Sequence, residues 1–293
     1  MIEYIQAKTI MSKSKSGYAW FGIDYTINLY RGCNFGCIYC DSRSDVYHNE
    51  NFDKVKVKQD ALTLLEKELK SKRHKGIISL GAMSDCYNDL EKDLHLTRDA
   101  LKLINDYGFG VCLSTKSDLV LRDIDILNEL SKNKGAIILV TITDYKQERA
   151  SFLEPRASSV EERFNIIKTL NDNGIYCGIL MMPLIPRVND SVDNITNIVK
   201  LGKQAGAKCI VPSYGVTLRK GQQEYFASKL KEVYPNLYNE YYYANTYYKG
   251  SPNEKNLKVV FEGLCQRLDI DYKMKDIIEA YKTKEPEQLS LPL

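Results

Sequence analysis

The stretch "NLYRGCNFGCIYCDSRSD", residues 28–45, places three of the chain's eight cysteines, Cys33, Cys37 and Cys40, within eight positions. A glycine directly precedes each of the first two cysteines, which leaves room for a bulky group close to the backbone. The spacing Cys-x3-Cys-x2-Cys occurs once, and no fourth cysteine follows in the same segment. A structural zinc site normally takes four ligands. The three cysteines therefore indicate a different kind of metal site.

An iron–sulfur cluster is held by cysteine thiolates, with one thiolate per iron in the four-iron form. Three thiolates leave one iron open, and an open metal position is typical of a catalytic site. The alternatives are three unligated cysteines, or a zinc site that His48 completes. Cysteines in a polar, glycine-containing segment are poor core residues, so the pattern favours the cluster.

The composition is that of an ordinary globular protein, with 27% charged and 44% apolar residues. The net charge of +3 is too small to indicate a nucleic-acid-binding protein, although a local basic patch would suffice for one. The N-terminus has no signal-peptide pattern, and the longest apolar run, residues 135–142, is too short to span a bilayer. We expect a cytoplasmic protein with no membrane partner, in which clustered cysteines indicate metal binding or catalysis.

From about residue 25 to 215, short apolar runs alternate with amphipathic segments. The apolar runs predict buried parallel strands at residues 26–30, 76–80, 110–114, 136–142, 176–182 and 208–212. The amphipathic segments predict helices at residues 60–70, 97–107, 159–173 and 191–205. Repeated strand–helix units predict an α/β fold with a partial, open (β/α)6 barrel, and a doubly wound sheet is the alternative.

The alternation ends near residue 215, which predicts three regions along the chain. These are a barrel at 1–215, a helical, tyrosine-rich extension at 216–280, and a flexible tail at 281–293. Seven tyrosines lie between residues 234 and 248. We expect them to pack helices against the barrel, and the alternative is that they stack on unpaired bases.

The cysteine spacing, with the aromatic Tyr39 directly before the last cysteine, resembles that of radical S-adenosylmethionine (SAM) enzymes. Four further stretches, at residues 84–98, 113–123, 152–157 and 181–190, are similar to blocks of one branch of that superfamily, in the same order. They read "SDCYNDLEKDLHLTR", "LSTKSDLVLRD", "FLEPRA" and "MMPLIPRVND". The branch is the DNA repair photolyase or spore photoproduct lyase-like group, and the resemblance covers about residues 8 to 215.

The resemblance implies a partial (β/α)6 radical-SAM barrel in which Cys33, Cys37 and Cys40 hold a [4Fe-4S] cluster. In such enzymes the open iron chelates SAM, and an electron donor such as flavodoxin or ferredoxin supplies one electron. SAM is then cleaved to methionine and a 5′-deoxyadenosyl radical, which abstracts a hydrogen from the substrate.

The same resemblance assigns SAM contacts to residues at or after the ends of the predicted strands. They are Tyr39 near the adenine, Ser84 and Asp85 at the methionine amino group, Lys116 at the polar end, and Thr141 and Met182 as further contacts. This placement agrees with the rule that α/β barrels bind ligands at the carboxyl ends of their strands. The alternatives are that Asp85 is a helix N-terminal carboxylate, Lys116 a solvated lysine and Met182 a core residue.

The match to spore photoproduct lyase fails at two positions. The lyase has its hydrogen-donor cysteine two positions before Ser84, where this chain has Ala82, and a tyrosine after the last cluster cysteine, where this chain has Asp41. Cys86 is the candidate substitute donor, although a buried small residue is the favoured interpretation. The leading function is a radical SAM enzyme acting on DNA, in repair or modification. The alternatives are an RNA, peptide or small-molecule substrate, or a non-catalytic iron–sulfur adaptor.

The last six residues, "QLSLPL", resemble the hexapeptide that binds the bacterial DNA polymerase sliding clamp. Gln288, Leu291 and Leu293 would be its anchors, and the charged segment before them would give the peptide reach. Such a peptide binds weakly alone and gains from tethering on DNA. The alternative is a tail that folds back on the barrel.

Overall fold

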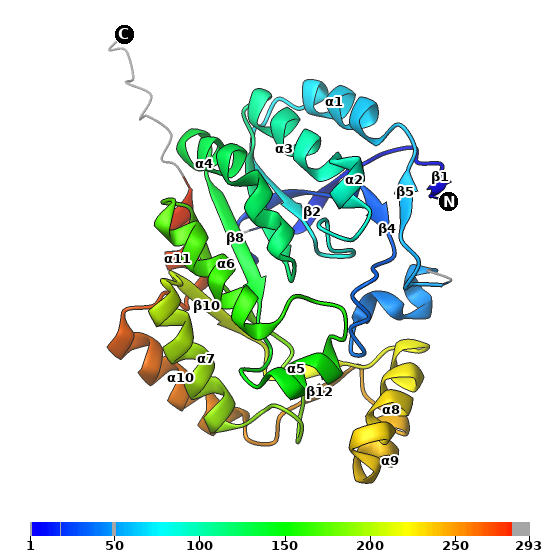
Figure 1. Ribbon diagram of the computed structural model, residues 1–293, viewed down its shortest axis with the longest axis vertical. Coiled ribbons are helices and arrows are strands. Elements are labelled where there is room, and N and C mark those ends of the chain that lie inside the picture. The colour runs from blue at the N-terminus through cyan, green and yellow to red at the C-terminus, as the bar shows by residue number, and fades with distance from the viewer. Residues whose placement is uncertain (1, 18, 49–50, 283–293) are drawn as a thin grey trace.

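The computed structural model describes residues 2–17, 19–48 and 51–282. At its centre lies a seven-stranded sheet in the order β10-β9-β8-β7-β6-β3-β2 (Figure 1). Its strands are β2 (Met11–Gly17), β3 (Ile23–Ile27), β6 (Ile77–Leu80), β7 (Gly110–Thr115), β8 (Ala136–Thr141), β9 (Tyr176–Met181) and β10 (Cys209–Pro212). Six of them, β3 and β6 to β10, are parallel, and β2 runs antiparallel beside β3. The predicted partial (β/α)6 barrel is confirmed.

Helices that connect the parallel strands cover one face of the sheet (Figure 1). They are α1 (Ala61–Ser71), α2 (Glu91–Leu94), α3 (Leu96–Asp106), α4 (Ile124–Asn133), α5 (Gln147–Leu153), α6 (Val160–Asp172) and α7 (Val192–Ala205). The four predicted helices are present, whereas α4 was not predicted. Helix α6 begins where the sequence directs it, since Ser159 and Glu162 form both hydrogen bonds of a capping box.

The inner face of the sheet is divided between a packed half and an open half. Strand side chains point alternately to the two faces, so every second residue faces inward. Near the strand beginnings, Ile77 and Ile137 pack against Ile277 and Ile278 of α11 (Met274–Tyr281). Nearer the strand ends, the inward residues are not covered by α11 and line a cavity. The sheet is therefore closed by α11 at one end and accessible at the carboxyl ends of its strands.

A second, three-stranded sheet in the order β1-β5-β4 holds the segment that carries the three cysteines. Its strands are β1 (Glu3–Ile5), β4 (Tyr30–Arg31) and β5 (Lys56–Lys58). Gly32 directly follows β4 with φ +83°, and a Cβ there would lie 2.6 Å from the carbonyl oxygen of Lys54. Glycine is needed here because the two ends of the cysteine segment cross closely. The neighbouring Cys33 N–H donates to the Phe52 carbonyl at 2.8 Å.

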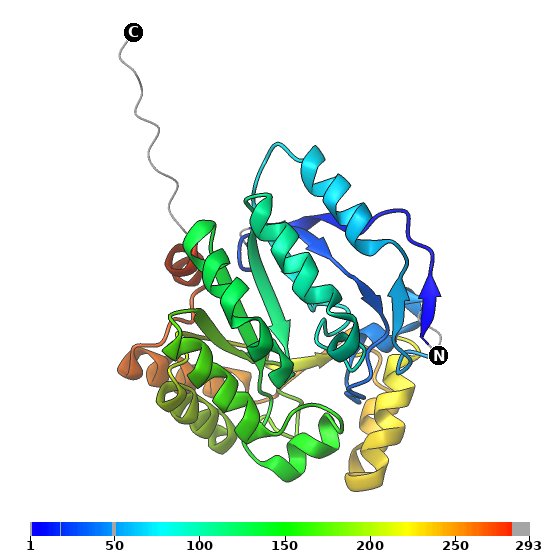
Figure 2. The ribbon, with the colours of Figure 1, turned by 45° about the horizontal axis from the view of Figure 1, so that its top comes forward.

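After β10 the chain forms an outer unit and then returns to the barrel. The strands β11 (Gly215–Thr217) and β12 (Tyr248–Gly250) pair antiparallel, and α8 (Gln222–Val233) and α9 (Tyr238–Tyr242) lie between them in the sequence. Figure 2 shows this helical unit, in yellow, at the edge of the molecule, and α8 packs against α9. Helix α10 (Glu254–Leu268) packs against α7. The division of the chain at residue 215 stays a prediction.

Two further expectations concern the C-terminal hexapeptide and membrane spans. The clamp-binding hexapeptide, with Gln288, Leu291 and Leu293, lies outside the described residues, so it stays a prediction from the sequence. Within the described residues, no helix combines the length and the apolar character needed to cross a membrane.

Candidate functional site

The carboxyl ends of the parallel strands surround a cavity of about 370 Å³. This volume is in the usual range for a small-molecule or cofactor site. Three groups of residues form its wall. The strand ends contribute Ser79, Gly81, Ser114, Lys116, Thr141 and Met182, the cysteine segment contributes Tyr39, Cys40 and Asp41, and the rim includes Trp20, Thr217 and Tyr248. The cavity therefore joins the cysteine segment to the strand ends, as the sequence predicted.

Five of the predicted site residues line this one cavity: Tyr39, Cys40, Lys116, Thr141 and Met182. They come from four separate places in the sequence, and only the parallel arrangement of the strands brings them together. If these residues contact one cofactor, they must line the same cavity, and they do. Each individual contact to SAM stays a prediction.

The three cysteine thiols are neighbours in a poorly hydrated part of the site. Burial, with smaller contributions from Asp85 and Cys40, raises the pKa of the Cys33 thiol to about 11. Burial also raises the pKa of the thiols of Cys37 and Cys40. The neighbouring Cys40 and Cys33 further favour the protonated thiol of Cys37 and so raise its pKa. Such thiols keep their protons until a metal displaces them. A set of three soft sulfur ligands suits iron–sulfur chemistry.

Across the described ranges, no three or more His, Cys, Asp or Glu side chains are arranged so that they could hold a metal ion. This holds for the three cysteines with His48, the ligand set of the zinc alternative. A four-iron cluster takes one thiolate per iron, so its ligands need not converge on one point. The donor set fits the cluster, and Cys33, Cys37 and Cys40 stay its predicted ligands.

A buried polar network fixes Tyr39 at the cavity wall. The Tyr39 hydroxyl donates to one carboxylate oxygen of Glu154, and the Arg163 guanidinium donates to the other. Arg163 also donates to the Thr141 carbonyl at 2.9 Å, which ties the network to the end of β8. Burial opposes ionisation of Glu154, but Arg163 and Lys116 outweigh it and lower the pKa of that carboxyl.

Glu154 and Arg163 were not predicted as site residues. Glu154 lies directly after α5, and Arg163 lies on α6 at a position that the helical pattern gives to the core, in line with Ile166, Ile167 and Leu170. An arginine within an apolar stripe was the signal available in the sequence. Its exposed fraction is only 1%, and a buried arginine requires a carboxylate partner.

Ser84 and Asp85 lie beside the cavity but are not part of its lining. The Ser84 hydroxyl donates to the Gly32 carbonyl of the cysteine segment. Asp85 accepts hydrogen bonds from the Thr115 hydroxyl at 2.8 Å and from the Lys116 N–H at 2.9 Å. Both residues therefore fasten neighbouring segments to each other. Their contact with the methionine amino group of SAM stays a prediction.

Replacing Asp85 with asparagine separates these two roles. Asparagine has one acceptor oxygen, so it cannot satisfy the Thr115 and Lys116 donors together, and we expect the free energy of unfolding to fall by about 1–3 kcal/mol. If Asp85 acts only by fastening these segments, the Kd for SAM stays within about twofold of wild type. Urea unfolding and calorimetric titration with SAM measure the two quantities. Unchanged stability with a SAM Kd raised about tenfold would instead establish a direct ionic contact.

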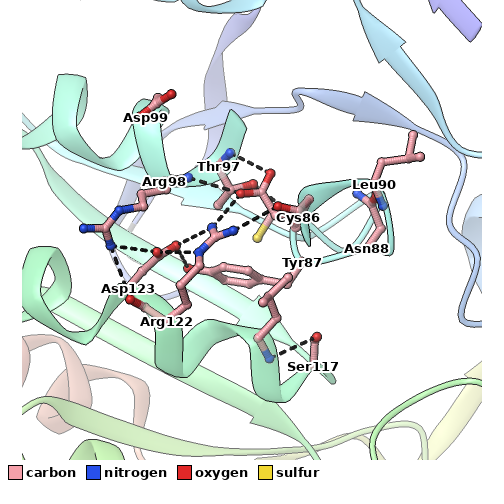
Figure 3. Close-up of polar contacts among 12 residues, drawn as sticks. Cys86, Tyr87, Asn88, Leu90, Thr97, Arg98, Asp99, Ser117, Arg122 and Asp123 are labelled. Atoms are coloured by element: carbon pink, nitrogen blue, oxygen red, sulfur yellow. Dashed lines mark hydrogen bonds and ion pairs between the residues drawn. The ribbon is translucent and has the colours of Figure 1, made fainter. Parts of the chain in front are cut away.

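Cys86, the candidate hydrogen donor, lies away from the cavity. It is buried in the core between the sheet and its helices, and its carbonyl accepts a hydrogen bond from the Thr97 hydroxyl at 2.7 Å. Figure 3 shows Cys86 beside Tyr87, Arg122 and Asp123, in a network that includes the hydrogen bond from Tyr87 to Asp123. This position suits the buried small residue that the sequence favoured. The donor role of Cys86 stays a prediction that its position does not support.

Both positions at which the match to spore photoproduct lyase fails, Ala82 and Asp41, line the cavity. Asp41 accepts a hydrogen bond from the Tyr47 hydroxyl at 3.1 Å and pairs with Arg219 Nε at 2.8 Å. A cysteine that was not predicted as a site residue, Cys112 on β7, also contributes to the lining. The two positions at which the sequence departs from the resemblance to that lyase therefore both lie in the cavity wall.

A family model described as the radical SAM superfamily matches residues 27–199, more than half of the chain. The chain belongs to the radical SAM superfamily. Members of this superfamily bind a [4Fe-4S] cluster and SAM, which confirms the two predicted cofactors.

Curated relatives with a similar sequence carry no described activity. An uncharacterized protein of Methanocaldococcus jannaschii is 36% identical over 173 residues, which cover 58% of this chain and 63% of the relative. An uncharacterized protein of Mycobacterium bovis is 25% identical over 224 residues, which cover 74% of this chain and 66% of the relative. The chain thus spans slightly less than two thirds of the length of these relatives.

Solved structures show the same fold at low sequence identity. A spore photoproduct lyase variant with bound SAM and dinucleoside spore photoproduct has a TM-score of 0.67 at 15% identity, covering 90% of this chain and 78% of that chain. The SAM methyltransferase TsrM from Kitasatospora setae, with tryptophan substrate and a SAM analogue bound, has a TM-score of 0.55 at 12% identity, covering 82% of this chain and 51% of that chain. The fold of the radical SAM superfamily is therefore established for this chain.

Proposed function

We propose that this protein is a radical SAM enzyme in which Cys33, Cys37 and Cys40 hold the [4Fe-4S] cluster. The observation that carries the proposal is that Cys40 and residues of several strand ends line the same cavity. When bound, the cluster and SAM supply reductive cleavage of SAM to a 5′-deoxyadenosyl radical, which removes a hydrogen from the substrate.

The residues of the chain hold SAM in one orientation and keep water away from the reacting atoms. The Tyr39 ring, fixed through Glu154, offers a flat surface for the adenine. Burial lowers the pKa of Lys116, but Cys37, Glu154 and Asp85 outweigh it and raise the pKa, so the ammonium is charged at neutral pH. A charged ammonium at the cavity wall suits the carboxylate of SAM.

Replacing Lys116 with methionine is expected to weaken SAM binding about 10- to 100-fold. The change removes a charge-assisted hydrogen bond worth about 1.5–3 kcal/mol while keeping the length and apolar part of the side chain. Calorimetric titration of the cluster-loaded protein with SAM measures the effect. Lys102→Met is the matched control, because Lys102 pairs with Asp99 on the exposed side of α3. An unchanged Kd for Lys116→Met would remove Lys116 from the SAM site.

We further propose that the substrate is a lesion or other modified position in DNA. The proposal is supported by the similarity to the lyase blocks and by the fold shared with a lyase solved with a dinucleoside lesion. Because Ala82 and Asp41 occupy the cavity wall, the route differs from that of the lyase. The sliding clamp and a flavodoxin or ferredoxin donor are the proposed partners. An RNA, peptide or small-molecule substrate and a non-catalytic adaptor remain the alternatives.

Formation of 5′-deoxyadenosine is the test. Protein reconstituted with iron and sulfide without oxygen is incubated with a chemical reductant and SAM, with and without irradiated DNA, and products are separated by chromatography. We expect 5′-deoxyadenosine in the reduced samples and none without reductant. Stimulation by irradiated over intact DNA would support the DNA lesion. No product in any reduced sample that contains an intact cluster would contradict the enzymatic function and favour the adaptor.

A further inference from the structure

Of the seven tyrosines that were expected to pack, Tyr234, Tyr238 and Tyr241 lie in an apolar cluster, whereas the other four are exposed. Tyr242, Tyr243, Tyr247 and Tyr248 have exposed fractions of 36%, 72%, 57% and 41%, and we call them the tyrosine strip. Tyr241, directly before them in the sequence, is fully buried and anchors the segment. Large exposed aromatic rings that gather in one short segment indicate a binding surface.

The rings of the tyrosine strip are held in place by their neighbours. Tyr242 stacks on Tyr238 with 5.1 Å between ring centroids, and Tyr243 meets Tyr242 edge-on at 5.0 Å. The Arg219 guanidinium lies 4.7 Å from the centroid of the Tyr247 ring and donates a hydrogen bond to its hydroxyl. Because these rings are already ordered, a ligand that packs on them loses little conformational entropy on binding.

The tyrosine strip begins at the mouth of the cavity. Tyr248 lines the cavity, and its ring crosses Gly215, where a Cβ would lie 2.6 Å from Tyr248 Cζ. Arg219, beside Tyr247, pairs with Asp41, which also lines the cavity. A ligand that binds on the strip can therefore extend directly into the cavity.

The charges around the strip favour an anionic chain with flat rings. Besides Arg219, the neighbouring cations include Lys220, whose side chain is 84% exposed, and Arg187, at 57%. Arg187 and Lys249 share the single carboxylate of Glu240, at 2.6 and 2.9 Å, and the exposed Lys220 ammonium lies 4.0 Å from Asp45, so positive charge is in excess beside the strip. Unpaired bases stack on tyrosine rings and on arginine planes, and phosphates pair with the cations. A duplex offers no free base faces along its length.

We propose that the tyrosine strip binds a single-stranded segment of nucleic acid, so that the adjoining nucleotide enters the cavity. This inference rests on the proposed function, because it takes the cavity to be the place of the reaction. It adds the form of the substrate: a strand with unpaired bases next to the reacting nucleotide.

Fluorescence anisotropy with a labelled single-stranded DNA of about 12 nucleotides tests the inference. The variants are Tyr243→Ala with Tyr247→Ala, and Tyr243→Phe with Tyr247→Phe. Each lost stacking ring is expected to weaken binding about tenfold, whereas phenylalanine keeps the ring and most of the affinity. Tyr4→Ala is the matched control, because Tyr4 is 56% exposed on β1, outside the strip. The same DNA as a duplex is expected to bind at least about tenfold more weakly.

The outcomes separate this inference from the proposed function. Equal binding by wild type and by the double alanine variant would overturn the inference that the tyrosine strip binds single-stranded nucleic acid. Equal binding of duplex and single strand would overturn it as well. Neither result would bear on SAM cleavage. Absence of any binding to DNA or to the same sequence as RNA would overturn both the strip and the nucleic-acid substrate. Binding of a proline-rich peptide in place of the oligonucleotide would overturn the strip in favour of a protein partner. Formation of 5′-deoxyadenosine decides the radical chemistry independently.

Discussion

A protein in which Cys33, Cys37 and Cys40 are all replaced by alanine is expected to contain no [4Fe-4S] cluster and to form no 5′-deoxyadenosine. The three thiols lie in the segment between β4 and β5, and burial keeps them protonated until iron displaces the protons. Without them the cluster has no protein ligand. The rate of SAM cleavage is expected to fall at least about 100-fold, since replacing even the residues that hydrogen-bond to metal ligands can lower activity by that factor.

Iron content, sulfide content and 5′-deoxyadenosine formation are the measurements. Cys265→Ala is the matched control, because Cys265 is buried in α10, away from the cysteine segment. This control is expected to keep its iron and its activity, which shows that removing a buried cysteine does not by itself abolish the cluster. Full iron and sulfide in the triple variant would show that other residues ligate the cluster. The single variants are expected to lose activity as completely as the triple variant, because each removes the ligand of one iron.

The central sheet was predictable because parallel strands buried on both faces are continuous apolar runs. The prediction was least accurate at β3, expected at 26–30 and found at Ile23–Ile27, because Tyr30 and Arg31 leave the main sheet and pair with β5. Strand β2 was not predicted, since "MSKSKSG" is a polar strand at the sheet edge. Its pairing depends on the neighbouring strand rather than on an apolar pattern of its own.

The candidate site was predictable where a residue's place in the strand determines its direction. Lys116 and Met182 directly follow β7 and β9, Thr141 is the last residue of β8, and all three line the cavity. That Ser84 and Asp85 lie beside the cavity rather than in its wall was not predictable, because the directions of their side chains depend on the turns of the segment after β6. The contact between Tyr39 and Glu154 joins residues 115 positions apart, so only the tertiary fold shows it.

Replacing Arg163 with methionine is expected to lower the free energy of unfolding by about 3–5 kcal/mol at neutral pH, because the buried Glu154 carboxylate would lose the cation that is hydrogen-bonded to it. In the wild type the pKa of Glu154 is lowered, so its contribution is present above the unfolded pKa and is lost as pH falls through the folded pKa. In the variant, Lys116 still opposes the effect of burial but Arg163 no longer does, so the pKa of Glu154 rises and the folded protein takes up a proton at Glu154 at a higher pH than the wild type does. The loss therefore shrinks as pH falls toward about 4, where the unfolded carboxyl is protonated too.

Urea unfolding at neutral and acidic pH measures both features of this prediction. Arg156→Met is the matched control: Arg156 is 53% exposed and pairs with Asp53 at 3.2 Å, so its loss is expected to cost less than about 1 kcal/mol. Glu154→Gln combined with Arg163→Met is expected to be more stable than Arg163→Met alone, because no buried carboxylate is left without its hydrogen-bonded cation. A loss for Arg163→Met that is as small as for Arg156→Met, or independent of pH, would contradict the buried pair. Because Glu154 also holds the Tyr39 hydroxyl, the double variant should bind SAM more weakly than wild type although its stability is partly restored.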